Sequence, residues 1–476
     1  MAIKPIKFGT DGWRAIIGED YTFENVRYCT QGVADYFQQK GKPEKGVVVG
    51  YDTRFASEHF ADAAAEVLCG NGIRVLLADR ACPTPVASFN LVQRKATGGI
   101  VITASHNPGT YNGFKVKPDY GGSASPEIVA EIEGYISREQ QTGQVKRMPL
   151  AEAEKKGLLE RFDPTPAYLK HMGTLVKLDE IKQSPLKIVV DSMYGAGAGY
   201  IAQLLRGGKA QVIEIHGERN PAFPGMAQPE PITQNLQGLS KAIRDHKADV
   251  GIATDGDADR LGLMDEHGRF ITQLQTISLL ALYLLDVQGK RAPIVKSITT
   301  SSMLFRLGEL YKVPVFETSV GFKYIGPIMI KEKAMLGGEE SGGYGFAGHI
   351  PERDGILSGL FILSMMVNLK KKPSELIDYL YKKVGPHHYD RHDITFDPAQ
   401  RDAIMKRLGD SRPATLGGSK VVGIDTFDGR RFRLEDGSWS LIRFSGTEPL
   451  LRIYCETTSP ERVQQLLVET RRLTGA

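Results

Sequence analysis

Short apolar runs alternate with segments of helical periodicity through most of this chain, and that alternation constrains its fold more than any other feature. In the first part, apolar runs at residues 47–49, 73–77 and 99–102 are separated by helical stretches such as the alanine-rich segment 60–68. This order is typical of strand–helix–strand units, which build parallel sheets covered by helices. We therefore predict an α/β fold.

The alternation recurs in three blocks of similar size, which suggests a structural repeat, and a fourth block differs from them. In the fourth block apolar and polar residues alternate as in antiparallel strands, before a final helix. A chain of 476 residues also exceeds what one hydrophobic core can organise. We predict four domains, at residues 1–150, 160–289, 290–384 and 385–476; the first three are α/β and the last is α+β.

Composition disfavours several classes of protein. Lysine and arginine number 60 against 56 aspartates and glutamates, so the net charge of +4 provides no broad basic surface for a nucleic acid or a membrane. No window reaches the ~18 consecutive apolar residues of a membrane span. The four cysteines stand singly, without the spacing of a zinc site or a disulfide framework. We expect a cytoplasmic protein, and the sequence leaves monomer and homodimer both open.

A serine follows one of the apolar runs on a turn that packing does not require. The run at 99–102 leads into residues 103–108, where an Asn-Pro pair ends the strand because proline lacks an amide proton. Ligands bind at the carboxyl ends of strands in such sheets, so Ser105 is a candidate nucleophile, and we hypothesise that it carries a phosphoryl group. The glycines of a GxSxG esterase turn are missing. His106 is a candidate general base; the alternative is a histidine bonded to backbone.

Three aspartates two residues apart form a second candidate site. Asp255, Asp257 and Asp259 follow a buried strand on a glycine-containing loop, and their carboxylates offer hard oxygen ligands to one divalent cation. An EF-hand has the same spacing, but its sixth position requires glycine and is Arg260 here, and the flanks resemble strands. A solvated acidic turn is the remaining alternative. We predict a divalent-cation site, because three unneutralised carboxylates would repel one another.

Two patterns that would indicate a nucleotide are absent. Gly195, Gly197 and Gly199 follow a predicted strand, but the third glycine of a dinucleotide fingerprint would fall at Tyr200. A tight strand-to-helix turn therefore explains these glycines better. The phosphate-loop pattern GxxxxGK[ST] does not occur in the chain. A nucleoside triphosphate is not the implied ligand.

The remaining candidates lie on three turn-like segments. Residues 443–449 combine an arginine, two hydroxyls and a glycine, the composition of a phosphate-binding loop, and Arg452 follows them. The carboxylates and hydroxyl of residues 338–343 suit sugar hydroxyl groups, although any exposed turn has a similar composition. Lys115 follows an Asn-Gly turn. Beside a phosphoserine and a metal it could act as an acid or a base.

In this order along the chain, the motifs resemble those of the α-D-phosphohexomutase superfamily, which includes phosphoglucomutases and phosphomannomutases. The segments that carry the resemblance are 8–14, 103–108, 112–115, 255–260, 338–342 and 443–449. The resemblance implies four domains around a central cleft: three related mixed α/β domains and a C-terminal domain with a TATA-box-binding-protein-like fold. Within this superfamily the chain is most similar to a phosphoglucomutase.

The resemblance also implies a role for each motif. Ser105 is the phosphoserine and contributes to a Mg²⁺ site with Asp255, Asp257 and Asp259. The implied catalytic residues beside the transferring group are Lys115, Arg14 and Arg260, and His106 is kept as a catalytic candidate from its position beside Ser105. The implied substrate-binding residues are Lys323, Glu339, Ser341, Arg443, Ser445, Gly446, Thr447 and Arg452. The four domains then carry the phosphoserine, the metal, the sugar-recognition loop and the phosphate-binding loop in turn. The role of Phe322, beside Lys323, stays open.

The implied reaction interconverts glucose 1-phosphate and glucose 6-phosphate through a hexose 1,6-bisphosphate, with glucose 1,6-bisphosphate as intermediate and activator. Phosphoryl transfer depends on positioning and on neutralised charge, which explains the metal and the arginines. The Glu-Glu-Ser core of the sugar loop, at residues 339–341, looks more like that of phosphoglucomutases than like the Glu-Met-Ser form of phosphomannomutase/phosphoglucomutase or the Glu-Gln-Ser form of phosphoglucosamine mutases. This resemblance favours glucose, with mannose phosphates as further substrates. Phosphomannomutase and phosphoglucosamine mutase are the alternatives, followed by a metal-dependent sugar phosphatase and by a protein that only binds sugar phosphates.

Overall fold

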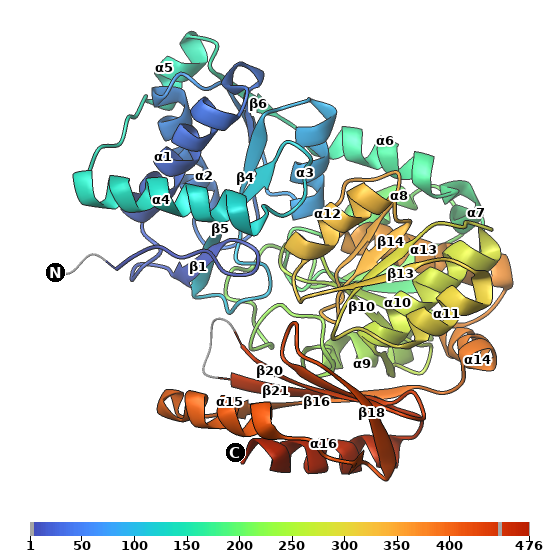
Figure 1. Ribbon diagram of the computed structural model, residues 1–476. Coiled ribbons are helices and arrows are strands. Elements are labelled where there is room, and N and C mark those ends of the chain that lie inside the picture. Colours follow the sequence, from blue (N-terminus) through green and yellow to red (C-terminus); the bar gives the residue numbers. More distant parts are fainter. Residues whose placement is uncertain (1–3, 446–449, 476) are drawn as a thin grey trace.

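Four β-sheets follow one another along the chain in the computed structural model, which describes residues 4–445 and 450–475 (Figure 1). Three sheets contain parallel strands and are associated with helices, and the fourth is antiparallel, so the predicted fold class is confirmed. Within the described residues no helix is long and apolar enough to cross a membrane.

The strands of each sheet can be given in spatial order. The first sheet contains β1 (Trp13–Ile16), β5 (Tyr111–Pro118), β4 (Gly98–Ile102), β2 (Val47–Tyr51), β3 (Val75–Ala78) and β6 (Leu159–Phe162). The second contains β11 (Phe270–Ile271), β10 (Leu261–Met264), β9 (Val250–Thr254), β7 (Lys187–Asp191) and β8 (Gln211–Ile215). The third contains β13 (Val315–Thr318), β12 (Ile294–Ser297), β14 (Leu336–Gly338) and β15 (Tyr344–Phe346). The fourth contains β16 (His388–Thr395), β21 (Leu450–Thr457), β20 (Trp439–Phe444), β19 (Arg430–Leu434), β18 (Ser419–Asp425) and β17 (Thr415–Leu416).

The helices lie between these strands in sequence, except for the last one, which follows β21. Those up to β6 are α1 (Phe23–Lys40), α2 (Ser57–Gly70), α3 (Thr84–Gln93), α4 (Pro126–Thr142) and α5 (Leu150–Lys155). Those up to β12 are α6 (Thr165–Leu175), α7 (Leu178–Lys182), α8 (Tyr200–Leu204), α9 (Gln237–His246) and α10 (Gln273–Leu282). The rest are α11 (Met303–Tyr311), α12 (Phe322–Glu332), α13 (Gly355–Leu369), α14 (Pro373–Val384), α15 (Arg401–Asp410) and α16 (Pro460–Thr474).

Two features show how closely the domains are joined. Strand β6 lies in the first sheet beside β3, although it comes after residue 150 in sequence. Helix α13 is buried over most of its length and packs on β9 and β10 of the second sheet as well as on β15 of the third. One continuous apolar core therefore runs from the second domain into the third, which holds their loops in a constant relation.

The first three domains repeat one arrangement that places a loop at the site. In each, a strand parallel to its neighbour is followed by a loop and an antiparallel strand. The loop is 103–110 between β4 and β5, 255–260 between β9 and β10, and 339–343 between β14 and β15. These are the serine, acidic and sugar loops, so the structural repeat supplies one candidate site loop per domain.

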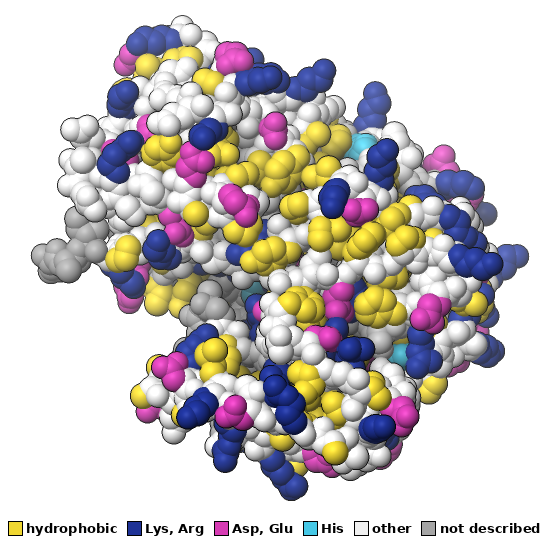
Figure 2. All heavy atoms as spheres, in the orientation of Figure 1, with side chains coloured by type: hydrophobic (Ala, Val, Ile, Leu, Met, Phe, Trp, Pro, Cys, Tyr) yellow, Lys and Arg dark blue, Asp and Glu magenta, His cyan; other side chains and the backbone are white. Residues whose placement is uncertain are grey.

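The fourth domain is built differently. Its helices α15 and α16 cover one face of the antiparallel sheet, as the lower part of Figure 1 shows. The opposite face packs on the third domain through Trp439, Leu441 and Tyr454, which contact Ile298. Figure 2 shows a hollow on the visible face between the first domain, above, and the fourth, below.

Candidate active site

Ser105 lies on the tight turn that connects β4 to β5. Its backbone φ is +51°, in the left-handed region that non-glycine residues seldom adopt, and its side chain is 0 % exposed. Its amide donates to Thr103 Oγ1 at 2.9 Å, and its Oγ donates to Asp255 Oδ2 at 2.7 Å. A strained backbone at this point requires surrounding contacts that hold it in place.

Arg54 supplies those contacts and was not found from the sequence. The guanidinium is 0 % exposed and pairs with Asp52 at 3.3 Å. It donates to carbonyl oxygens of the serine loop and of the start of β5, those of Ser105, Asn107, Pro108 and Tyr111. Five rigid donors suit such a set of acceptors, whereas a lysine has one point charge. The only sequence signal was its position at the carboxyl end of β2.

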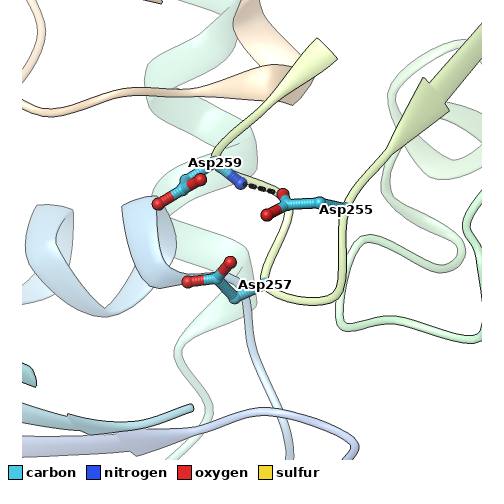
Figure 3. Close-up of side chains that lie close together, drawn as sticks. All are labelled: Asp255, Asp257 and Asp259. Atoms are coloured by element: carbon cyan, nitrogen blue, oxygen red, sulfur yellow. Dashed lines mark hydrogen bonds between the residues drawn. The ribbon is translucent and has the colours of Figure 1, made fainter. Parts of the chain in front are cut away.

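The acidic loop contacts the serine loop directly. Oxygen atoms of Asp255, Asp257 and Asp259 lie within 4.8 Å of one another, and all three side chains are buried (Figure 3). Gly256 lies between them, and a Cβ there would be 2.4 Å from the carbonyl oxygen of Ser105. Only glycine lets the two loops approach so closely.

The acidic loop presents carboxylate oxygens that no described group satisfies. Oδ1 of Asp255 accepts from the amides of Asp259 and Arg260, which closes the loop. Oδ2 of Asp257 accepts from Thr84 and Lys115. The Oδ1 atoms of Asp257 and Asp259 are buried without a hydrogen-bond partner. Because a buried anionic oxygen without a partner is costly, this donor set fits a divalent cation.

Two cations from other domains face the acidic loop. Lys115 Nζ lies 2.8 Å from Asp11 Oδ2, 2.8 Å from Asp257 Oδ2 and 3.2 Å from Asp259 Oδ2. Arg353 Nη2 contacts the same oxygens of Asp11 and Asp259, the second at 2.9 Å. Neither Asp11 nor Arg353 was assigned a role from the sequence. Removing one member would leave an unpaired buried charge, so the network joins the first three domains tightly.

The pKa values in this network follow from burial and from the nearest charges. Burial, with Asp259 and Asp257 nearby, raises the pKa of Asp255 well above its usual range. Burial also favours the neutral form of Asp257, but Lys115, Thr84 and Arg353 together outweigh it and lower the pKa of Asp257. Burial alone would lower the pKa of Lys115, yet Asp11, Asp257 and Asp259 together raise it. Lys115 therefore carries its proton in this arrangement.

The other residues expected beside the transferring group have distinct surroundings. His106 Nδ1 is 3.4 Å from Ser105 Oγ, and burial, reinforced by nearby arginines and Lys115, lowers the pKa of this histidine well below its usual range. Arg14 Nη1 donates to Asn107 Oδ1 on the serine loop at 2.7 Å. Arg260 Nη1 donates to Glu230 Oε1 at 2.8 Å. Thus His106 is neutral, and Arg14 is attached to the serine loop.

The sugar loop is bonded to the end of the acidic loop. The Leu261 amide donates to the Gly342 carbonyl at 2.9 Å, and Gly342 has φ +90° with no room for a Cβ beside the Leu261 carbonyl. Burial raises the pKa of Glu339 to about 7. Ser341 Oγ is buried without a described partner. Glu339 Oε2 lies 3.7 Å from Arg353 Nη1, so its side chain adjoins the charged network, and the Ser341 hydroxyl lacks a hydrogen-bond partner among the described residues.

The neighbouring 319–323 loop lies against the first domain. A Cβ at Gly321, where φ is +126°, would be 2.9 Å from Thr10. Phe322 begins α12, is 2 % exposed and packs in an apolar cluster with Ile325. Lys323 Nζ lies 5.4 Å from the ring centre of Tyr324.

The phosphate-binding candidates lie on the fourth sheet. Arg443 and Arg452 form a cross-strand pair between β20 and β21. Arg443 Nε donates to Asp428 Oδ1 at 2.8 Å, and Asp428 Oδ2 accepts from the amide of Val320 in the 319–323 loop at 2.7 Å. Ser445 is buried at the end of β20. Two further candidates, Gly446 and Thr447, lie outside the described residues.

Models of all four domains of one family match consecutive parts of the chain. They are described as phosphoglucomutase/phosphomannomutase alpha/beta/alpha domains I, II and III and the C-terminal domain, at residues 5–143, 166–268, 274–384 and 394–473. The chain belongs to the phosphoglucomutase/phosphomannomutase family. The expected superfamily is confirmed, and with it an enzyme of the isomerase class, an intramolecular phosphotransferase acting on hexose phosphates.

Similar proteins carry different sugar names. A phosphoglucomutase/phosphomannomutase of Thermococcus kodakarensis is 33% identical over 97% of this chain and 96% of its own. A "probable phosphoglucosamine mutase" of Methanothermobacter thermautotrophicus is 34% identical over 98% and 97%. A solved structure from Thermus thermophilus, provisionally named a phosphomannomutase, is 35% identical, with TM-score 0.86 over 99% of this chain and all of the other. Family membership defines the reaction class but not the sugar.

Proposed function

We propose that this phosphohexomutase interconverts glucose 1-phosphate and glucose 6-phosphate through phospho-Ser105 and glucose 1,6-bisphosphate, and also accepts mannose phosphates. The observation that carries the proposal is the contact of Ser105 Oγ with Asp255 at 2.7 Å, inside a carboxylate cluster with unpartnered buried oxygens. A hydroxyl in that position can be phosphorylated and dephosphorylated beside a cation.

In the first half-reaction a hydroxyl oxygen of the sugar phosphate bonds to phosphorus while the bond from phosphorus to Ser105 Oγ breaks. Lys115, which carries a proton, donates it to the serine oxygen and accepts the proton that the sugar hydroxyl releases. The bisphosphate then turns over, and its other phosphoryl group returns to Ser105 by the reverse step. Atoms and charge balance over the two half-reactions.

Asp255, Asp257 and Asp259 would hold Mg²⁺ together with a phosphate oxygen on Ser105. The ion would neutralise charge on the transferring phosphoryl group. Arg14, attached to the serine loop through Asn107, and Arg260, on the acidic loop, would contact the same group from two sides. Arg443, Ser445 and Arg452 would bind the phosphate that is not being transferred, with Gly446 and Thr447 as further candidates and Lys323 as a second contact.

Glu339 and Ser341 would read adjacent sugar hydroxyls. A carboxylate accepts two hydrogen bonds, and the unpartnered Ser341 Oγ provides another polar contact. A second candidate sugar is glucosamine phosphate, favoured by the name of the Methanothermobacter thermautotrophicus relative. A coupled assay with the 1-phosphates of glucose, mannose and glucosamine separates these candidates. A strong preference for glucosamine would overturn the choice of glucose.

Ser105→Ala tests the reaction itself. We expect mutase activity to fall by at least about a thousandfold and the mass of a phosphoryl group to disappear from the intact protein. Ser88→Ala is the matched control, because Ser88 is equally buried on α3 and its Oγ has no hydrogen-bond partner in the structure. Full activity in Ser105→Ala would overturn the proposal. Steady release of inorganic phosphate by the wild type would favour a phosphatase, and tight binding without label exchange would favour a binding protein.

A further inference from the structure

Glu340 lies between Glu339 and Ser341 in the sugar loop, and its side chain bonds to the fourth domain. Its Oε1 accepts from Tyr389 Oη at 2.7 Å and from Arg391 Nη1 at 3.2 Å. Its side chain is 16 % exposed. The Glu-Glu-Ser core that favours glucose in sequence terms therefore contains one residue that is occupied by a contact between domains.

Tyr389 and Arg391 belong to the sheet face that carries the phosphate-binding candidates. They are two residues apart on β16, so their side chains share one face. Residues that lie side by side on neighbouring strands form rows across the sheet. Arg391 of β16 lies beside Tyr454 of β21. In the next row on the same face, Asp393 of β16, Arg452 of β21 and Arg443 of β20 lie side by side. Of the two partners of Glu340, Arg391 thus lies one row and Tyr389 two rows from the arginines proposed to bind phosphate.

Ion pairs continue from one row to the next. Arg391 Nε lies 2.9 Å from Asp393 Oδ1, and Asp393 Oδ2 lies 3.6 Å from Arg452 Nε. A path of charged side chains therefore runs from Glu340 in the sugar loop to Arg452. Displacement of the sheet relative to the third domain changes both ends of this path together.

The contact of Glu340 with the fourth domain restrains the sugar loop at the position between its two proposed sugar-binding residues. The backbone of the loop is bonded to the acidic loop through Leu261, but Glu339 and Ser341 must also present their side chains to a ligand that reverses its orientation during the reaction. Glu340 lies between them, so a contact on its carboxylate limits rotation of the loop at the position where both neighbours are set.

We propose that Glu340 is a positioning residue: through Tyr389 and Arg391 it makes the geometry of Glu339 and Ser341 depend on the docked position of the fourth domain. This inference rests on the proposed function, because it takes Glu339 and Ser341 as the residues that bind the sugar. Phosphate bound on the fourth domain then stabilises the sugar-binding geometry of the third, and the two contacts hold the bisphosphate while it turns over.

The test compares Glu340→Ala, Tyr389→Phe and the double variant with the wild type, using glucose 1-phosphate and added glucose 1,6-bisphosphate. We expect Glu340→Ala to raise KM about tenfold, and to require about tenfold more bisphosphate for half-maximal activity because the intermediate escapes. The double variant should be no worse than Glu340→Ala, since Glu340→Ala already removes the contact that Tyr389→Phe breaks. Glu340→Gln, which keeps an acceptor for Tyr389, should recover to within about threefold of the wild type.

Glu317→Gln is the control for a general loss of docking. Glu317 of β13 also crosses to the fourth domain, where its Oε1 accepts from Arg431 at 2.6 Å, but it is outside the sugar loop. We expect an unchanged bisphosphate requirement in this variant. Equal effects in Glu317→Gln and Glu340→Ala, or a Glu340→Ala enzyme with wild-type KM and bisphosphate requirement, would overturn the inference.

Failure of this inference is distinguishable from failure of the proposed function. A wild type without mutase activity on any hexose phosphate contradicts the proposed function, whereas an active wild type with indifferent Glu340 and Tyr389 variants contradicts only the inference. Tyr389→Phe removes a single hydroxyl, so it provides the same comparison if Glu340→Ala does not fold.

Discussion

The reactive centre and the phosphate-binding face of the fourth domain hold their charges in opposite ways. At the centre, Ser105, Asp257 and Lys115 are at most 1 % exposed, and ion pairs from three domains surround them. On the fourth domain the side chains of Arg443 and Arg452 are 19 % and 28 % exposed. One set of charges is buried and paired before substrate arrives, and the other keeps contact with water.

This difference in burial suits the reactive centre to phosphoryl transfer and the fourth domain to substrate binding. Electrostatic contacts are stronger where water is excluded, so a buried centre can stabilise the charge of a transferring phosphoryl group without reorganising. Partly hydrated arginines bind and release a phosphate at lower cost, which suits a substrate that must turn over. Changes at the centre should therefore lower kcat, and changes on the fourth domain should raise KM.

Asp257→Asn provides the largest expected effect. The change removes one proposed metal ligand and the 2.8 Å contact with Lys115, so kcat should fall about a thousandfold. Steady-state kinetics at saturating Mg²⁺ measure it. Asp245→Asn, on an exposed aspartate of α9 paired with Lys241, should leave kcat unchanged. If Asp257→Asn kept a tenth of wild-type activity, the proposal that the acidic loop takes part in phosphoryl transfer would be wrong.

The buried carboxyl group of Glu339 should make the stability of the protein depend on pH. Burial raises the pKa of this group from 4.5 to about 7, so the folded protein binds this proton more tightly than the unfolded chain. The resulting stability is complete below pH 4.5 and is lost as the pH rises through 7, a change of about 3 kcal/mol. Chemical denaturation of wild type and Glu339→Gln at pH 5 and 7.5 measures it as the change in their difference. An identical difference at both pH values would contradict the buried carboxyl.

Arg54→Lys tests whether the serine loop depends on its clamp. One ammonium cannot replace a guanidinium that donates to four carbonyl oxygens, so the strained turn at Ser105 should relax and kcat should fall about a hundredfold, with KM within about threefold. Arg94→Lys, on a partly exposed arginine at the end of α3, is the control. If Arg54→Lys raises KM and leaves kcat unchanged, Arg54 contributes to substrate binding, which contradicts the assignment of kcat effects to the reactive centre.

Arg443→Lys should produce the opposite pattern. Loss of the guanidinium should raise KM for glucose 1-phosphate about thirtyfold while kcat stays within about threefold. Added salt should raise the wild-type KM in the same sense, because these charges are partly hydrated. Arg433→Lys, on the more exposed arginine of neighbouring β19, should match the wild type. A fall in kcat alone would place Arg443 in the reactive centre.

Motifs that combine local spacing with reactive side chains were predictable from the sequence. Asp255, Asp257 and Asp259 lie two residues apart, and the structure confirms that they form one cluster. Arg54, Arg353 and Asp11 were not assigned because each acts on residues far away in the chain, and nothing near them in sequence marks the contact. The roles of the predicted site residues in catalysis or binding, His106, Lys323 and Arg452 among them, remain predictions.

The sequence by itself determined the α/β blocks, the antiparallel last domain and the loops that carry chemistry, because periodicity, turn residues and spacing are local properties. Tertiary structure alone decided that the serine loop contacts the acidic loop at Gly256 and that Lys115 is held by three carboxylates. It also directed Glu340 toward the fourth domain. The physical reason is that burial and long-range pairing set the charge state and direction of a side chain, and neither is encoded near it in the chain.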